Sequence, residues 1–210
     1  QSILRKFGYQ INSYPESDIR RRMKIIKNSN INKILDIGAS YGQYASELRK
    51  FGFHGNIISF EPLSSAFKVL KTNSQKDNNW QQFNFALGNN DGDTKINIAG
   101  NSFSSSLSTM LDSHIKAAPH SSYVGIENII IKKMDTIFDS VYEKGDNIML
   151  KIDTQGYEKN VLEGSEQSLK YISLIQLEMS LIPLYENETL FIDMLNFLKN
   201  KNFELISIEN

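Results

Sequence analysis

The sequence predicts an α/β fold with a mostly parallel central sheet that helices cover on both faces. Short, nearly continuous apolar runs alternate along the chain with segments whose apolar residues recur at helical spacing. Such alternation implies right-handed crossovers between parallel strands that are buried on both sides. At 210 residues, with 40% hydrophobic and 22% charged residues, the chain is long enough to form one domain with a substantial core.

The expected elements follow one another with polar or glycine-containing turns between them. Strands are expected over residues 33–37, 57–60, 81–86, 94–99, 128–133, 148–152, 173–178 and 203–208. Helices are expected over residues 41–48, 63–70, 161–169 and 191–198, where apolar residues return every three or four positions. Residues 1–30 should form a helical lead-in, with Ile19, Met23 and Ile26 on one stripe, and residues 31–210 the main domain.

The composition excludes several classes of function. With a net charge of −1, the chain has no overall field that would attract nucleic acid. The absence of cysteine excludes a disulfide framework and a thiolate nucleophile, and the three histidines are too scattered for a metal signature. No apolar run has membrane-spanning length and no signal peptide is recognisable, so we expect a cytoplasmic protein without a transmembrane segment.

The clearest functional signal is a glycine turn after the first expected strand. Asp36, Gly38 and Gly42 form a D-x-G-x-x-x-G spacing, and Glu61 ends the second strand, where an acid suits the hydroxyls of a ribose. A dinucleotide fingerprint would need a glycine where Ser40 stands. The carboxylate of Asp36 would repel a pyrophosphate but attract the ammonium group of an amino-acid cofactor. This pattern therefore favours S-adenosylmethionine over a dinucleotide.

Further motifs follow the glycine turn in a definite order. They are "NFALGNNDGD" from residue 84, "SSSL" at 104–107, "MDTI" at 134–137, "KIDTQGYEKNVLEG" at 151–164 and "IQLE" at 175–178. Their order and spacing resemble the FkbM-type S-adenosylmethionine-dependent methyltransferases, from about residue 31 to residue 210. The resemblance implies a Rossmann-like class I methyltransferase domain that methylates a hydroxyl oxygen, often of a sugar. This chain has Gln155 where the family often has an acid, and Ser40 where it often has Asn.

Position within these motifs implies which residues meet the cofactor. The glycine turn would line it, Glu61 would hold the ribose, residues 84–86 would border the adenine, and Asp153 would lie beside the methyl donor. The expected cofactor-binding set is therefore Asp36, Gly38, Ala39, Ser40, Gly42, Glu61, Pro62, Asn84, Phe85, Ala86 and Asp153.

Methyl transfer to a hydroxyl also needs a group that orients the acceptor and takes its proton. Asp153 is the first candidate because it follows a buried apolar strand, and Glu178 at the end of the next strand could face the same crevice. His114 and His120, in the serine-rich irregular segment 100–125, are further candidates because histidine can act as a base at neutral pH. A divalent cation held by Asp153 and Glu178 is a further option that the sequence leaves open.

Two other functions are compatible with the sequence. A nicotinamide-dependent sugar oxidoreductase would share the fold, but it needs a pyrophosphate turn and usually a Tyr-x-x-x-Lys pair, which "YVGIENIIIKK" at 123–133 does not provide. A non-catalytic module that binds S-adenosylmethionine would show binding without turnover. The acceptor of the methyltransferase would be a small molecule or a glycan, and it would meet the segments 100–125 and 181–187. The composition of these segments does not identify the acceptor.

Overall fold

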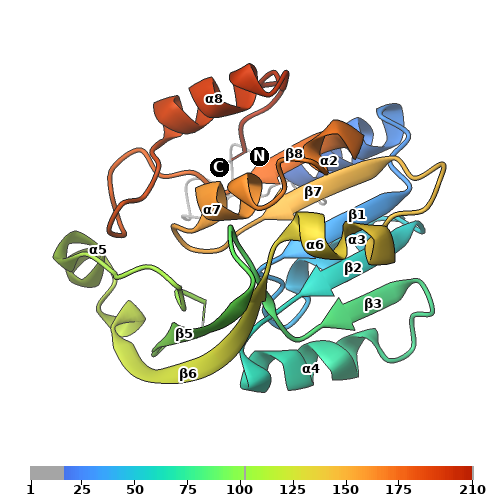
Figure 1. Ribbon diagram of the computed structural model, residues 1–210. Helices are drawn as coiled ribbons and strands as arrows, with labels where there is room; N and C mark the ends of the chain where they lie inside the picture. The colour runs from blue at the N-terminus through green and yellow to red at the C-terminus, as the bar shows by residue number, and fades with distance from the viewer. Residues whose placement is uncertain (1–16, 102, 210) are drawn as a thin grey trace, which may run out of the picture.

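The fold is built on a central sheet of five parallel strands, with the order β3-β2-β1-β7-β8 (Figure 1). The structure is a computed structural model, and it describes residues 17–101 and 103–209. Of the helical lead-in expected over residues 1–30, residues 1–16 therefore lie outside the described part of the chain. The order reverses between the first strand and the seventh, so the two central strands come from distant parts of the chain. The strands of this sheet are β1 (Lys33–Ile37), β2 (Asn56–Phe60), β3 (Trp80–Phe83), β7 (Ile148–Ile152) and β8 (Ile172–Leu177).

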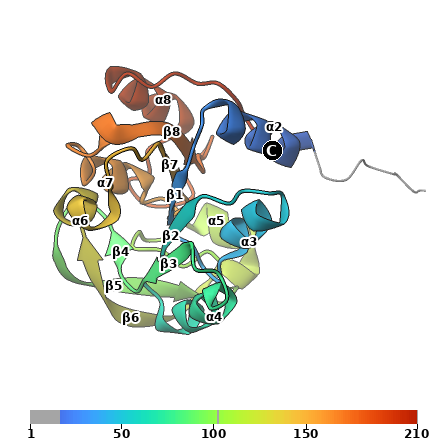
Figure 2. The same ribbon diagram turned by 90° about the vertical axis from the view of Figure 1, so that its right-hand side faces the viewer.

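Helices cover both faces of this sheet, as the alternating pattern predicts. Figure 2 separates α2 (Ser17–Asn28) and α3 (Gln43–Lys50) on one side from α6, α7 and α8 on the other. Strands β1 and β7 are buried at every position, which explains their continuous apolar runs. The remaining helices are α4 (Ser64–Ser74), α5 (Asp112–Ala117), α6 (Met134–Val141), α7 (Glu158–Glu163) and α8 (Phe191–Asn200), with short 3-10 turns η1 (Pro119–Ser121) and η2 (Leu169–Tyr171).

A second, smaller sheet lies beside the first, with the order β4-β6-β5. It consists of β4 (Ala86–Leu87), β5 (Gly92–Ala99) and β6 (Tyr123–Lys132), and β5 pairs antiparallel with β6. The expectation of one strand over 81–86 was wrong, because β3 ends at Phe83 and β4 joins the other sheet. Asn84 enforces the change of direction, since its Nδ2 donates to the carbonyl oxygens of Glu61 and Pro62, both at 2.9 Å.

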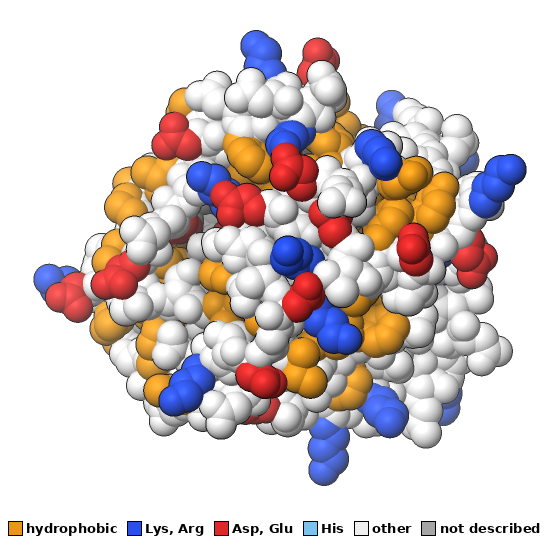
Figure 3. All heavy atoms as spheres, in the orientation of Figure 1, with side chains coloured by type: hydrophobic (Ala, Val, Ile, Leu, Met, Phe, Trp, Pro, Cys, Tyr) orange, Lys and Arg blue, Asp and Glu red, His pale blue; other side chains and the backbone are white. Residues whose placement is uncertain are grey.

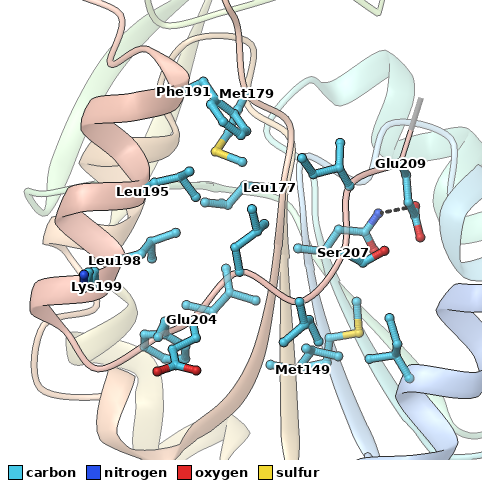
Figure 4. A pocket seen from close by; sticks show the side chains of 18 of the residues that line it. Met149, Leu177, Met179, Phe191, Leu195, Leu198, Lys199, Glu204, Ser207 and Glu209 are labelled. Atoms are coloured by element: carbon cyan, nitrogen blue, oxygen red, sulfur yellow. Dashed lines mark hydrogen bonds between the residues drawn. The ribbon is translucent and has the colours of Figure 1, made fainter.

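The expected strand over 203–208 is also absent from the described part of the chain. This segment is extended, yet a groove of about 810 Å³ separates it from the free edge of β8. Apolar side chains of α8 and the segment after β8 point into the groove, among them Met179, Phe191 and Leu195 (Figure 4). Side chains from α2 hold the segment instead of a strand ladder: Arg21 Nη1 donates to the carbonyl oxygen of Ile208 at 2.6 Å.

Two properties of the surface bear on partners. Figure 3 shows acidic and basic side chains interspersed on the face drawn, which agrees with the net charge of −1. Among residues 17–101 and 103–209, no helix combines the length and the apolar character that crossing a bilayer would require.

A row of polar side chains crosses the sheet on the face covered by α2 and α3. Ser59, Asp36, Lys151 and Gln176 are register neighbours on β2, β1, β7 and β8. Asp36 is completely buried, and its Oδ1 lies 3.3 Å from Nζ of Lys151. Its Oδ2 accepts a hydrogen bond from the Ser59 hydroxyl at 3.1 Å. Buried charges need partners of this kind, so the two central strands are joined by an ion pair as well as by their ladder.

Asp36→Asn is expected to lower the free energy of unfolding by about 3–5 kcal/mol, because Lys151 would stay buried without its nearest counter-charge. Urea denaturation measures this difference in the free energy of unfolding. Glu166→Gln is the control, since Glu166 pairs with Lys201 while remaining 68% exposed, and its loss should cost less than about 1 kcal/mol. Equal losses in the two variants would contradict a structural role for the buried pair.

Candidate functional site

A cavity of about 310 Å³ opens at the carboxyl ends of the central strands. In a parallel sheet these ends share one edge, and here the order of the strands reverses between β1 and β7. In Figure 1 the arrowheads of β2 and β3 point toward β5 and β6. The cavity is lined from the central sheet by Gly38, Ser40, Glu61, Pro62, Asp153, Gln155 and Glu178, and from the second sheet and its loop by Ile96, Phe103, Ser105, Ser106 and Leu107.

The turn after β1 is held so close to its neighbours that glycine is required at Gly38. Gly38 has a φ of +75°, and a Cβ atom there would lie 1.8 Å from the carbonyl oxygen of Asp153. Backbone N–H groups of Gly38 and Ala39 donate to the carbonyl oxygen of Phe60, each at 3.1 Å. The turn is therefore fixed between β2 and β7, and its backbone borders the cavity.

Glu61 reaches across from β2 to the same turn. Its Oε2 accepts a hydrogen bond from the N–H of Ser40, and its Oε1 accepts one from the N–H of Leu63, both at 2.8 Å. Burial raises the pKa of Glu61 to about 7, although these two backbone donors oppose the shift. A carboxylate fixed in this way presents its remaining lone pairs to the cavity, where they can accept hydrogen bonds from ligand hydroxyls.

The expected cofactor-binding residues divide into two groups. Gly38, Ser40, Glu61, Pro62, Ala86 and Asp153 line the cavity, whereas Asp36, Ala39, Gly42, Asn84 and Phe85 do not. Asp36 lies beneath the turn against Lys151, and Gly42 caps α3 with a φ of +83°. Phe85 packs on the ring of Phe60, with ring centroids 5.6 Å apart. This second group shapes the loops around the cavity from outside it.

Asp153 and Glu178 form a carboxyl pair at the cavity wall. Gln155 Nε2 donates a hydrogen bond to each group, at 3.0 Å to Asp153 Oδ1 and 2.6 Å to Glu178 Oε2. Burial and the neighbouring Asp153 raise the pKa of Glu178, whereas Lys151, whose Nζ lies 3.5 Å from Asp153, lowers the pKa of Asp153 against the effect of burial. Of the two groups, Glu178 is therefore the one that favours a proton, and Asp153 is the one that favours ionisation.

The histidine candidates lie away from this pair. His114, on α5, contacts the ring of Tyr185 edge-on, with centroids 5.2 Å apart. His120 is exposed in η1, and neither histidine lines the cavity. Within the described residues, no group of three or more His, Asp or Glu side chains is placed to hold a metal ion.

Sequence reasoning missed Lys151, Gln155 and Tyr185. Lys151 could have been noticed, because a lysine within the apolar run "IMLKI" must be buried and needs a carboxylate. Burial lowers its pKa, but Asp36 and Asp153 outweigh that effect and raise it, so Lys151 stays charged. Gln155 stood out only as a departure from the family motif, and Tyr185 only as part of the segment 181–187. Their hydroxyl-to-amide contact joins loops 30 positions apart, so no local pattern indicated it.

A family model, described as the methyltransferase FkbM domain, matches residues 36–205 of this chain. The chain belongs to the FkbM methyltransferase family. The five parallel strands and their helices are accordingly a Rossmann-like methyltransferase fold. No curated protein and no solved structure matches the chain. The matched region of this FkbM methyltransferase contains every residue that lines the cavity, and membership speaks against the oxidoreductase alternative.

Gly38→Ala should destabilise the FkbM methyltransferase more than Gly52→Ala does, by about 1–3 kcal/mol in thermal or urea unfolding. Both glycines have positive φ, so both substitutions incur a similar backbone strain of about 1–2 kcal/mol. A Cβ at Gly52 meets nothing within 4 Å, whereas one at Gly38 collides with the Asp153 backbone. Equal destabilisation would show that the turn does not depend on this close approach.

Proposed function

We propose that this FkbM methyltransferase transfers the methyl group of S-adenosylmethionine to a hydroxyl oxygen of a small molecule or glycan, with a sugar as the favoured acceptor. The observation that carries the proposal is that one cavity brings Glu61 and the Gly38 turn together with the Asp153–Glu178 pair. The first set suits the hydroxyls of a nucleoside, and the second suits removal of a proton. Asp36, which is buried against Lys151, is not free to bind the ammonium group of the cofactor.

The residues of the cavity fit this cofactor in size and in chemistry. A volume of about 310 Å³ lies at the lower end of the range for small-molecule sites. The hydroxyl of Ser40 is buried and has no hydrogen-bond partner among the described residues, so it can bind a polar group of the ligand. Glu61 would accept hydrogen bonds from the ribose hydroxyls. When bound, S-adenosylmethionine would supply an electrophilic methyl group on its sulfonium.

The Asp153–Glu178 pair would handle the proton of the acceptor. A hydroxyl that attacks a methyl group loses its proton as the new bond forms, and an oriented carboxylate can hold and then take that proton. Lys151 helps keep Asp153 ionised, so a carboxylate oxygen is ready near neutral pH. Phe103 and Ser105, from the loop after β5, also line the cavity and would contact the acceptor. We also propose that the domain begins near residue 31, just after α2 ends at Asn28.

Calorimetry should show that S-adenosylhomocysteine binds and that NAD and NADP do not. At pH 8, where most of Glu61 is ionised, Glu61→Ala should weaken binding about ten- to a hundredfold, the effect of losing a charge-assisted hydrogen bond. Glu127→Ala is the control, because Glu127 also accepts hydrogen bonds at the start of α4 but does not line the cavity. Tighter binding of a nicotinamide dinucleotide would refute the proposed cofactor.

Asp153→Asn should reduce methyl transfer by about 10²–10⁴ while changing S-adenosylhomocysteine affinity little, because an amide cannot accept the proton of the acceptor. Turnover of labelled S-adenosylmethionine with a glycan extract measures the first quantity, and calorimetry measures the second. Asp91→Asn is the matched control, since Asp91 accepts hydrogen bonds at the start of α6 outside the cavity.

Three results would count against these roles. Turnover that survives Asp153→Asn within a few-fold would remove Asp153 as the base. Cofactor binding that falls together with turnover would assign Asp153 to the donor site instead. Binding of S-adenosylhomocysteine by the wild-type protein with no turnover of any acceptor would support the non-catalytic module.

A further inference from the structure

Gln155 uses its whole amide to join three other side chains. Its Nε2 group donates one hydrogen bond to Asp153 and one to Glu178, at 3.0 and 2.6 Å. Its Oε1 accepts a hydrogen bond from the hydroxyl of Tyr185 at 2.9 Å. The opposite orientation of the amide would place its oxygen against the oxygens of two carboxyl groups, so the chemistry of the neighbours fixes this orientation.

The backbone around Gln155 is held as firmly as its side chain. Gln155 has a φ of +57°, a left-handed conformation that persists only where the surroundings impose it. Its carbonyl oxygen accepts a hydrogen bond from the Ser106 hydroxyl at 2.6 Å. At the next residue, Gly156, a Cβ atom would lie 2.7 Å from atoms of Tyr185, and Tyr185 itself is only 2% exposed. The loop after β7 is thus pressed against a buried aromatic ring.

From this geometry we infer that Gln155, anchored by Tyr185, is a positioning residue that sets the separation of the Asp153 and Glu178 carboxyl groups and stabilises the form in which both are ionised. Each N–H donor favours a charged carboxylate over a neutral one. The inference deepens the proposed function, and its consequence for methyl transfer rests on that function. The carboxyl pair itself can be measured without any turnover.

Other charged groups act on the pair from the elements packed around it. Lys151 on β7 favours ionisation, and Asp36 on β1 neutralises part of the lysine charge. Glu158 on α7 disfavours ionisation of Glu178 through its negative charge. These groups are unchanged in Gln155→Leu, so a shift of the titration in that variant reports the loss of the amide.

The test is a ¹³C NMR titration of side-chain carboxyl groups in the cofactor-free protein. In the wild type, the second proton of the pair should leave well above the ordinary range for glutamate, near pH 8. Gln155→Leu keeps the size of the side chain but removes both donors, so this apparent pKa should rise by about one pH unit or more. Gln155→Glu should raise it further, because a like charge replaces the donors. Tyr185→Phe, which only loosens the anchor, should raise it least.

Gln81→Leu is the matched control, because it makes the same chemical change at an exposed position on β3 and should leave the titration unchanged. An upper pKa in Gln155→Leu equal to that of the wild type would overturn the inference. If Gln155→Leu does not fold by circular dichroism, Tyr185→Phe decides in its place, and an unshifted titration there would overturn the inference equally.

A measurement of methyl-transfer turnover beside the NMR titration distinguishes a failure of this inference from a failure of the proposed function. Methyl transfer should be slower in Gln155→Leu than in the wild type, with little change in S-adenosylmethionine KM, because the amide no longer holds the position and charge of Asp153. A wild-type protein without turnover would refute the proposed function, while the titration would still decide the role of Gln155. A rate of methyl transfer in Gln155→Leu equal to that of the wild type, while the titration moves, would remove the catalytic part of the inference.

Discussion

The buried ion pair between Asp36 and Lys151 is the interaction on which the site depends. It joins β1 to β7, the neighbouring strands at the centre of the sheet, although they lie more than a hundred positions apart in the chain. The same ammonium group also lies 3.3 Å from the carbonyl oxygen of Gly38 and 3.5 Å from Asp153. One cation therefore contacts both the backbone of the Gly38 turn and the carboxylate of the proposed base. Removing a lysine from water is costly, and these contacts offset that cost.

The carboxyl groups of the cavity differ in their hydrogen bonding and in their tendency to hold a proton, because their surroundings differ. Glu61 is buried between two backbone N–H donors that hold both of its oxygens, which suits a fixed acceptor. Asp153 is kept ionised by Lys151, and its charge in turn favours a proton on Glu178. Burial, hydrogen bonds and neighbouring charge thus give three carboxyl groups of one cavity different properties, which suit the different roles proposed for them.

Residues 103 and 105–107 line the cavity on the side of the second sheet, and the chain that follows them is joined to the segment 181–187, no residue of which lines the cavity itself. Met110 pairs with Tyr185 through an isolated bridge, and the N–H of Leu111 donates to the carbonyl oxygen of Leu184 at 2.9 Å. Ser106, from the first segment, contacts the carbonyl oxygen of Gln155. An acceptor that enters here would therefore meet loops that are already connected to the carboxyl pair.

The sequence by itself determined the elements whose signal is local. Apolar runs located the five central strands, and the glycine spacing with the ordered motifs predicted the family and the edge of the sheet where the cavity opens. It failed where a local pattern had to compete with tertiary contacts. Residues 203–208 have the composition of a strand, but they bind Arg21 and leave a groove beside β8. Residues 81–86 divide between two sheets because Asn84 turns the chain.

Only the tertiary structure decided which side chains meet at the site. Lys151 faces Asp36 because β1 and β7 are paired in one register, and a shift by one residue would turn these side chains to opposite faces. Gln155 reaches Asp153, Glu178 and Tyr185 because a left-handed residue redirects the loop after β7. Strand order, register and loop direction are set by packing over the whole chain, so no short stretch of sequence contains them.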